Sequence, residues 1–448
     1  MKTNIKNARD LFLNLIEDNR KGLAKGIYSV CTANAEVLEA CFKQAKADKT
    51  FLLVESTSNQ VDQFGGYTGM RPADFVSYVN AIARKVGFPE EMVLLGGDHL
   101  GPNAWQHLPA KVAMDNSKVL IEEYVKSGYQ KIHLDTSMFC ADDQGDKTKP
   151  LQDEIVAERA ADLCRVAEDT WLKYCENCPK PIYTVGTEVP VPGGAHEAED
   201  EVIPTSPEDA SKTINIIKEA FLRAGLSDAW NRVIGVVVQP GVEFGDDQIF
   251  KYQREKAKEL SKKIMEFDHL IYEAHSTDFQ TEADLKALVE DHFCILKVGP
   301  WLTFAYREAL FALEAMEIEI LGKDHKGLSN LRQILENAMI GQPKYWERYY
   351  LGDEKQKFFK RKYSFSDRLR YYWPLAELDS AKNGLFENLR NNMIPSSLLS
   401  QFMPVQFYQV CEGVITADPK ELVHSYIQSV TGIYSRACGL SRLKKVHA

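Results

Sequence analysis

Residues 92–103 read MVLLGGDHLGPN, a short apolar run followed by a glycine pair and then by Asp98 and His99. Seven further apolar or β-branched runs occur along the chain, separated by segments with the apolar spacing of amphipathic helices. The eight runs are IYSVC (27–31), FLLVE (51–55), MVLLG (92–96), KIHLD (131–135), IYTVGTE (182–188), VIGVVVQ (233–239), LIYEA (270–274) and CILKV (294–298). The helical segments include 72–86, 117–127, 151–172, 207–223, 253–267 and 281–291.

This alternation predicts an α/β fold, a (β/α)8 TIM barrel over residues 1–330. A doubly wound open sheet is the rival fold, and the lack of a GxGxxG motif after the first run disfavours its dinucleotide-binding form. Near residue 330 the strand pattern ends, and Tyr, Phe and Arg crowd together in PKYWERYY (343–350) and KFFKRKYSFSDRLRYYWP (357–374). We therefore predict a helical, aromatic-rich C-terminal region over residues 331–448.

The aromatic and arginine side chains of this region have two interpretations. Aromatic-rich helices after a barrel commonly pack on the barrel or on another subunit, which would bury them. Alternatively, the region covers the barrel mouth, and Arg368, Arg370, Tyr371 and Tyr372 contact an anionic substrate there.

The composition excludes several classes of protein. With 44% hydrophobic and 26% charged residues the chain is neither disordered nor fibrous. Its 64 acidic and 54 basic residues give a formal charge of −10 without a long basic block, so we expect no nucleic-acid partner. Residues 1–22 lack the apolar segment of a signal peptide, and no run approaches the length of a membrane span. The sequence predicts a cytoplasmic protein without a membrane partner.

Ionisable side chains gather at the C-terminal ends of the predicted strands, where the active sites of TIM barrels lie. These residues are Ser29, Cys31, Glu55, Ser56, Gln60, Asp98, His99, Asn103, His133, Asp135, Glu188, Gln239, Glu243, Glu273, His275, Asp278, Lys297 and Gly299. Two histidines with neighbouring carboxylates indicate a divalent metal site. His133 lies on the same strand face as Asp135, and it is either a further ligand or a hydrogen-bonded core histidine.

Over nearly its whole length the sequence resembles the GatZ/KbaZ family, the non-catalytic subunit of class II tagatose-bisphosphate aldolase. That family includes proteins similar to tagatose/fructose 6-phosphate 4-epimerases. The resemblance is carried by ESTSNQVDQFGGYTGM (55–70), GGDHLGPN (96–103), KIHLDTSM (131–138), GTEVPVPGG (186–194), VVQPGVEF (237–244), YEAHSTDFQ (272–280), ILKVGPWLTFA (295–305) and YSFSDRLRYYWP (363–374).

The family is itself similar to class II aldolases, and this similarity implies roles for several residues. The catalytic aspartate and the zinc histidine that follows it fall on Asp98 and His99. An aspartate before a serine at the next strand end falls on Asp135 with Ser137. A metal-associated glutamate before a paired-glycine loop falls on Glu188, with Gly193 and Gly194, and Glu197 beyond is a further acid of that loop.

The last zinc histidine of the aldolases, which a phosphate-binding serine follows, falls on His275 with Ser276. Where the aldolases have their middle zinc histidine, this chain has Gln239. Because an amide oxygen is a weaker zinc ligand than imidazole, this departure implies weaker metal binding, recruitment of Glu188 or a harder ion, Mg²⁺ or Mn²⁺. The expected metal ligands are thus His99, Glu188, Gln239 and His275, the expected catalytic residues are Asp98, Asp135 and Glu188, and the metal is Zn²⁺, Mn²⁺ or Mg²⁺.

Two functions follow from the resemblance. The first is an enzyme, an isomerase that interconverts tagatose 6-phosphate and fructose 6-phosphate by retro-aldol and aldol steps, or a lyase if the fragments are released. Its expected substrate-binding residues are Ser276, Thr277, Asp278, Lys297, Gly299, Arg368 and Arg370. The alternative is an accessory subunit that stabilises a catalytic aldolase. We expect a homo-oligomer, and the absence of GxxxxGK(S/T) disfavours a sugar kinase.

Overall fold

The computed structural model describes residues 7–147, 149–175, 178–186 and 201–441. Eight parallel strands close into a barrel in the order β1-β10-β9-β6-β5-β4-β3-β2. They are β1 (Ile27–Val30), β2 (Leu52–Thr57), β3 (Val93–Leu100), β4 (Lys131–Leu134), β5 (Ile182–Val185), β6 (Val233–Val237), β9 (Ile271–Ala274) and β10 (Phe293–Val298). The predicted (β/α)8 barrel is therefore confirmed, with each predicted run on one strand. A two-stranded antiparallel sheet of β7 (Glu243–Phe244) and β8 (Ile249–Phe250), which the sequence did not predict, follows β6.

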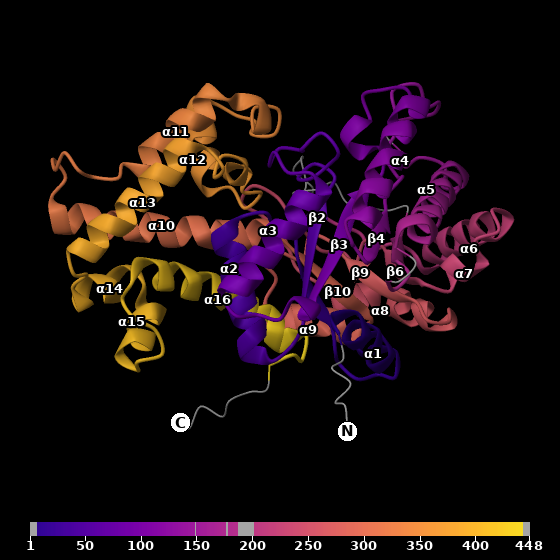
Figure 1. Ribbon diagram of the computed structural model, residues 1–448, viewed down its shortest axis with the longest axis horizontal. Coiled ribbons are helices and arrows are strands. Elements are labelled where there is room, and N and C mark those ends of the chain that lie inside the picture. Colours follow the sequence, from indigo (N-terminus) through magenta and orange to yellow (C-terminus); the bar gives the residue numbers. More distant parts are fainter. Residues whose placement is uncertain (1–6, 148, 176–177, 187–200, 442–448) are drawn as a thin grey trace.

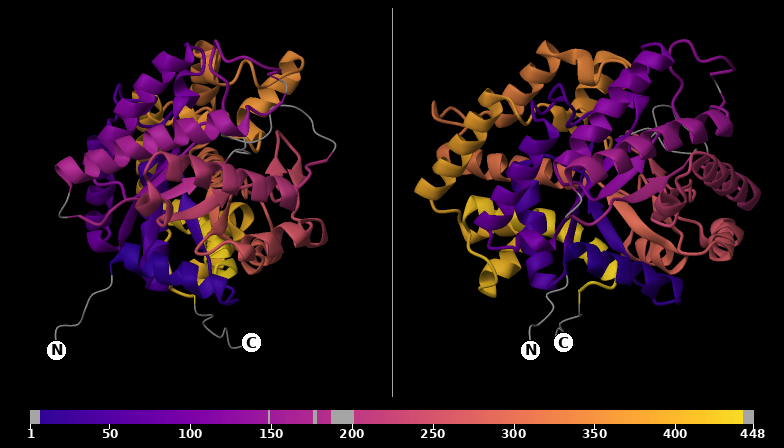
Figure 2. Two further views of the ribbon diagram at one scale, coloured as in Figure 1. Left: turned by 90° about the vertical axis from the view of Figure 1, so that its right-hand side faces the viewer. Right: turned by 45° about the vertical axis from the view of Figure 1, so that its right-hand side comes forward.

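Helices surround the barrel and extend to one side of it (Figures 1 and 2). The helices up to the last barrel strand are α1 (Ala8–Arg20), α2 (Ala35–Asp48), α3 (Pro72–Lys85), α4 (Ala110–Lys126), α5 (Asp153–Tyr174), α6 (Pro207–Arg223), α7 (Ser227–Trp230), α8 (Arg254–Lys263) and α9 (Glu282–Glu290). Those that follow are α10 (Pro300–Leu321), α11 (Leu331–Gly341), α12 (Glu354–Tyr363), α13 (Ala376–Asn391), α14 (Ser396–Phe402), α15 (Pro404–Cys411) and α16 (Pro419–Ala437). None of the helices in the described ranges combines the length and the apolar character that crossing a membrane requires.

Two apolar layers support the barrel. The larger one lies between the strands and the surrounding helices. The smaller one fills the N-terminal end of the barrel interior, where Ile27, Leu53 and Ile271 from the strands meet Phe12 and Ile16 of α1. Because α1 closes this end with apolar side chains, the polar groups of the interior lie toward the C-terminal ends of the strands.

The C-terminal region is helical, as expected, but its last helix belongs to the outer wall of the barrel. In Figure 1, α10 leads away from the strands and α11–α15 lie beyond it, whereas α16 returns to the barrel. There α16 packs against α2, α9 and α10. A hydrogen bond and an ion pair hold it there: His424 Nε2 lies 2.8 Å from Glu36 Oε2, and Lys420 Nζ lies 3.0 Å from the same oxygen. The last helix of the C-terminal region is thus part of the barrel wall.

Candidate active site

We call the smaller apolar layer, at the N-terminal end of the barrel interior, the apolar plug. Above it the barrel interior contains a ring of four buried charges. Lys131 Nζ of β4 lies 2.7 Å from Glu55 Oε1 of β2 and 2.8 Å from Glu273 Oε2 of β9. Lys297 of β10 donates a short hydrogen bond to Glu55 Oε2, and its Nζ lies 3.1 Å from Glu273 Oε1. Positive and negative charges therefore alternate around the ring, and a third carboxylate, Asp98, lies 3.0 Å from Lys297 Nζ.

Two glycines leave the space that these charged groups occupy. A Cβ atom on Gly96 would lie 2.4 Å from Glu55 Oε1, so any side chain there would force Glu55 to move. A Cβ atom on Gly235 would lie 2.9 Å from Thr184 Oγ1, and this hydroxyl donates a hydrogen bond to Glu273 Oε2. Gly96 therefore leaves the space that Glu55 occupies, and Gly235 leaves the space of Thr184, which is hydrogen-bonded to Glu273.

Three imidazoles lie directly above the ring. The ring centroids of His99, His133 and His275 are 4.9–5.3 Å from one another. Ligand atoms of Asp98, His133, Glu273 and His275 all lie within 4.8 Å of one another, and all four side chains are buried. His133 Nδ1 lies 2.8 Å from Asp98 Oδ1, and His275 Nε2 lies 3.2 Å from Glu273 Oε1.

This cluster fits a divalent metal ion. Two imidazole nitrogens and two carboxylate oxygens are ligands that Zn²⁺ and Mn²⁺ accept. His133 Nε2 is buried and has no hydrogen-bond partner among the described residues, although buried polar atoms are normally paired. The residues that would hold a metal are therefore Asp98, His133, Glu273 and His275.

His99 forms a separate hydrogen-bonded pair with Asp135. Its Nδ1 lies 2.8 Å from Asp135 Oδ2, while Ser137 donates to Asp135 Oδ1 at 2.7 Å. Burial lowers the pKa of His99, but the carboxylates of Asp98 and Asp135 outweigh this effect and raise it to about 9. Burial raises the pKa of Asp135, but the hydrogen bond and charge of His99 outweigh this and lower it. With a pKa of about 9 the imidazole carries both ring protons near neutral pH, so it donates a proton there and accepts one at Nε2 only after that nitrogen has lost its proton.

The backbone at the site is strained in two places. His99 and Ser276 have φ angles of 49° and 53°, in the left-handed region that non-glycine residues rarely adopt. The strand pairing between β3 and β4 shifts over Gly97 to Leu100, next to His99. Such strain is frequent at functional sites, because it aims a side chain where a regular strand would not.

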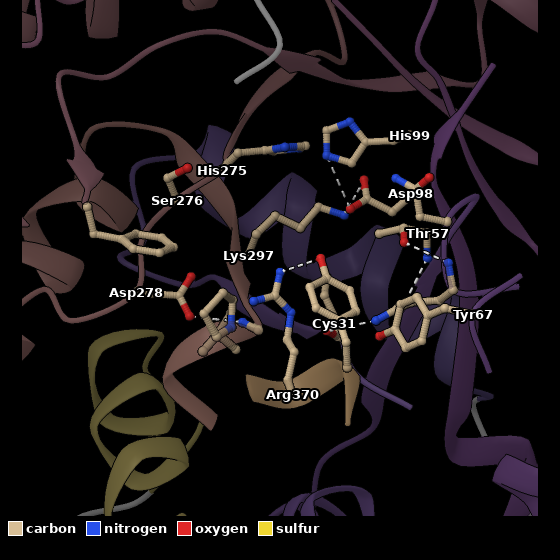
Figure 3. A pocket seen from close by; sticks show the side chains of 17 residues that line it. Cys31, Thr57, Tyr67, Asp98, His99, His275, Ser276, Asp278, Lys297 and Arg370 are labelled. Atoms are coloured by element: carbon tan, nitrogen blue, oxygen red, sulfur yellow. Dashed lines mark hydrogen bonds and ion pairs between the residues drawn. The ribbon is translucent and has the colours of Figure 1, made fainter. Parts of the chain in front are cut away.

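A pocket of about 690 Å³, including its opening to solvent, lies over the cluster. Asp98, His99, His275 and Lys297 form its floor, and Figure 3 shows Arg370 pointing into it from the opposite side. Arg370 belongs to the 3-10 helix η5 (Arg368–Tyr371) of the C-terminal region. Its Nη1 donates to the carbonyl oxygen of Asp367 at 3.0 Å, and its Nη2 donates to Tyr371 Oη at 2.9 Å.

An aromatic contact joins this segment to the barrel. The rings of Tyr345 and Tyr371 stack at 4.8 Å, and Tyr67, in the loop after β2, meets Tyr371 edge-on at 4.8 Å. The C-terminal region therefore borders the pocket, as one of the two interpretations of its sequence expected. Beyond Tyr67 and Arg370, a second pocket of about 1070 Å³ lies between the barrel loops and α13.

The site residues predicted from the sequence fall into four groups. Asp98, His99, His275, Ser276, Asp278, Lys297, Gly299 and Arg370 line the pocket. Asp135 lies behind His99. Glu188, with Gly193, Gly194 and Glu197, lies outside the described residues.

The other predicted residues point elsewhere. Gln239 Oε1 accepts from the backbone amides of Gly241 and Val242, so this oxygen is turned toward its own loop. Thr277 Oγ1 donates to the carbonyl oxygen of Lys297 at 2.6 Å. Arg368 is buried against Tyr349, with its Cζ 3.1 Å from the centre of that ring. The structure therefore does not bring Gln239, Thr277 or Arg368 to the pocket.

The carboxylate of Asp278 accepts hydrogen bonds from backbone N–H groups at the N-terminus of α10. It thereby occupies amides that were expected to bind phosphate. Its Oδ1 accepts from the backbone N–H groups of Gly299 at 3.0 Å and Trp301 at 2.8 Å. Burial raises the pKa of Asp278 to about 6, although these amides favour the carboxylate form. The Gly299 amide is thus already hydrogen-bonded, which leaves side chains as the anion-binding groups of the pocket.

Sequence reasoning missed Lys131 and left the role of His133 open. The signal was present in KIHLD, because Lys131, His133 and Asp135 alternate with Ile132 and Leu134 and so share one strand face. All three are buried, which in a barrel with an apolar outer layer places them inside. Glu55 and Glu273 were recognised only as strand-end residues, and their ion pairs depend on strand pairing that periodicity does not reveal.

These features define a class: a (β/α)8 barrel with a histidine–carboxylate pocket at the C-terminal ends of its strands, where barrel enzymes carry their active sites. A family model described as D-tagatose-1,6-bisphosphate aldolase subunit GatZ/KbaZ-like matches residues 12–439. The chain belongs to this family, which confirms the resemblance seen in the sequence. It is thus related to tagatose-bisphosphate aldolase.

The chain is also similar to solved structures. A probable tagatose 6 phosphate kinase from Sinorhizobium meliloti 1021 shares 41% identity over 92% of this chain and 100% of that chain, with a TM-score of 0.83. The fructose-bisphosphate aldolase from Campylobacter jejuni shares 14% identity over 87% of this chain and 96% of its own, with a TM-score of 0.43. The YdjI aldolase from Escherichia coli K12 shares 12% identity over 85% and 96%, with a TM-score of 0.40. The two aldolase likenesses are too distant to say anything of activity.

Replacing His133 tests the ligand set. We expect His133→Asn to weaken Mn²⁺ binding to the purified protein at least tenfold, because it removes one of four donors. Gln239→Ala should leave the affinity within about twofold, because its side-chain oxygen faces its own loop. Isothermal titration of metal-free protein measures both values. Equal losses in the two variants would contradict the ligand set described above.

Proposed function

We propose that this protein is a metal-dependent enzyme that interconverts tagatose 6-phosphate and fructose 6-phosphate by inverting carbon 4. The observation that carries the proposal is the pocket itself. Its floor combines four side chains that could hold a metal ion with the His99–Asp135 pair, and Arg370 faces them from the opposite side. A ketose phosphate has a reacting end and an anionic end, and the pocket offers a complementary group to each.

Epimerisation at carbon 4 requires breaking and remaking one carbon–carbon bond. A base removes the proton of the C4 hydroxyl, the C3–C4 bond breaks, and its electron pair moves toward the ketone oxygen to give an enediolate and an aldehyde. Rotation of the aldehyde and readdition of C3 to its other face inverts carbon 4, and the proton returns to the new hydroxyl. A bound divalent metal supplies Lewis-acid polarisation of the ketone.

We assign the proton transfer to His99, oriented by Asp135. Its ring lines the pocket, its Nδ1 is bonded to the carboxylate, and its Nε2, 3.7 Å from Asp98 Oδ2, serves as the base once it has lost its own proton. The sequence placed His99 among the metal ligands and gave Asp98 the catalytic role. In our proposal these roles are exchanged, because Asp98 lies within the four-residue cluster together with His133, Glu273 and His275. That donor set suits Zn²⁺ or Mn²⁺ better than Mg²⁺, which prefers oxygen ligands.

Arg370 is the group that we assign to the phosphate. The backbone carbonyls of Ser366 and Asp367 hold its guanidinium in place, so little entropy is lost when it binds an anion. The hydroxyl of Ser276 lines the same pocket and is a further donor. Lys297, in contrast, lies at the floor among three carboxylates, away from the place where Arg370 would hold the phosphate.

A second candidate function is an accessory subunit of a tagatose-bisphosphate aldolase, as the family description implies. Apolar side chains that would suit a partner are exposed on the C-terminal region, among them Leu351, Phe358 and Phe359. A kinase, as the Sinorhizobium meliloti protein is described, needs a nucleotide cradle, and the sequence contains no GxxxxGK(S/T).

The enzyme proposal is tested by supplying the purified chain alone with Mn²⁺ or Zn²⁺ and fructose 6-phosphate. We expect tagatose 6-phosphate to form, as measured by chromatography or NMR. Asp98→Asn and His99→Ala should lower kcat at least 100-fold, because each removes a group from the floor of the pocket. Lack of any product from the wild-type chain would favour the accessory function. Full activity in both variants would contradict the assignment of the site.

The phosphate assignment is tested by comparing two neighbouring arginines. Arg370→Met should raise KM for fructose 6-phosphate at least tenfold and change kcat less, because it removes a binding contact remote from the reacting carbons. Arg368→Met should leave KM within about threefold, because Arg368 is buried against Tyr349 outside the pocket. Steady-state kinetics measure both. A larger effect on KM in Arg368→Met would place the phosphate elsewhere.

A further inference from the structure

The ring of Glu55, Lys131, Glu273 and Lys297 is more than a device for stability. Removing four charges from water costs several kcal/mol per ion in general, and buried ion pairs repay this cost only in part. Apolar side chains of the same volume would stabilise a barrel interior at least as well. A buried charged layer directly beneath a pocket therefore indicates that one of its members acts on what the pocket binds.

Lys297 is the member of the ring that reaches the pocket. It lines the pocket over the cluster, whereas Lys131 has no exposed surface and does not line it. Both carboxylates that hold Lys131 also hold Lys297, through their second oxygens. Lys131 therefore fixes the two carboxylates, and these fix the ammonium group of Lys297.

Lys297 also shares carboxylates with the candidate metal cluster. Asp98 and Glu273 lie 3.0 and 3.1 Å from its Nζ, and both belong to the four-residue set. Each of these carboxylates can accept from the ammonium or hold a cation with the same lone pairs. When they hold a cation, Lys297 keeps its hydrogen bond to Glu55 and has N–H groups free for a ligand in the pocket.

We propose that Lys297 is a catalytic residue that donates a hydrogen bond to the ketone oxygen of the substrate and stabilises the negative charge that develops there. Lys131 is a positioning residue that acts through Glu55 and Glu273. Lys297 keeps its proton throughout, so no bond to it is made or broken. This role rests on the proposed function, but the placement of Lys297 beside the metal-binding carboxylates does not.

The placement of Lys297 beside Asp98 and Glu273 is tested by measuring Mn²⁺ binding in the absence of a sugar. Lys297 competes with a metal for two carboxylates and repels it as a like charge, so Lys297→Met should bind Mn²⁺ at least tenfold more tightly than the wild type. Glu55→Gln should bind Mn²⁺ more weakly than the wild type does. The substitution removes a negative charge, and Lys297 then pairs only with Asp98 and Glu273. Lys362→Met is the matched control, since this lysine of α12 is a largely buried partner of Glu336 on α11, and the Mn²⁺ affinity of this variant should equal that of the wild type.

The role toward the substrate is tested by kinetics with fructose 6-phosphate. Lys297→Met should lower kcat at least 100-fold and change KM less than threefold, because the contact strengthens only as charge develops. Lys131→Met should lower kcat by a smaller factor, about tenfold, again with little change in KM. If Lys297→Met does not fold, as judged by circular dichroism, Lys297→Met/Glu55→Gln preserves the charge balance of the ring and should still bind Mn²⁺ more tightly than the wild type.

The outcomes separate this inference from the proposed function. An inactive wild-type chain in which Lys297→Met tightens Mn²⁺ binding would refute the enzyme proposal and support the placement of Lys297. An active wild type with full activity in Lys297→Met would overturn the catalytic role and leave the enzyme proposal standing. Equal Mn²⁺ affinity in the wild type and Lys297→Met, or no binding in either, would overturn the placement.

Discussion

The burial of two lysines and two glutamates inside the barrel is the constraint on which the rest of the site depends. Gly96 leaves room for Glu55, and Gly235 leaves room for Thr184, which is hydrogen-bonded to Glu273. Lys131 then bridges the two carboxylates, and Lys297 closes the ring beneath the pocket. The apolar plug formed with α1 keeps water from the opposite end. The charges of the ring are therefore compensated by one another, by neighbouring side chains such as Asp98 and Thr184, and by what the pocket binds.

The C-terminal region forms part of the opening of the pocket. Helix α16 packs against α2 and α9, so the region is anchored at its far end. Between α12 and α13 the chain passes the barrel mouth, where Arg370 and Tyr371 line the pocket. Phe365, just before this segment, donates its backbone N–H to the carbonyl of Asp246 at 2.8 Å and so ties the segment to the turn between β7 and β8. The cationic side chain that we assign to the phosphate of the substrate, Arg370, thus comes from outside the barrel.

The fold was predictable from the sequence because each strand is a short apolar run and each turn is marked by polar or glycine residues. Pattern also located the strand ends, where Asp98, His99 and His275 lie around one pocket. It did not predict that Gln239 turns its oxygen to the amides of Gly241 and Val242, because such loop hydrogen bonds depend on local backbone geometry. Nor did it reveal Lys131 as a bridge, since that requires the pairing of strands distant in sequence. The 3-10 helix η5 directs Arg370 into the pocket and Arg368 against Tyr349, and the sequence pattern does not distinguish these two directions.

The central claim is that this pocket inverts carbon 4 by breaking and remaking a carbon–carbon bond. Conversion of fructose 6-phosphate in D2O, followed by NMR of the tagatose 6-phosphate formed, tests it most directly. In the proposed reaction the hydrogen on carbon 4 stays attached throughout as an aldehyde hydrogen, so the product should carry no deuterium at that position. Deuterium at carbon 4, or no interconversion at all with the metal-loaded wild-type protein, would contradict the claim.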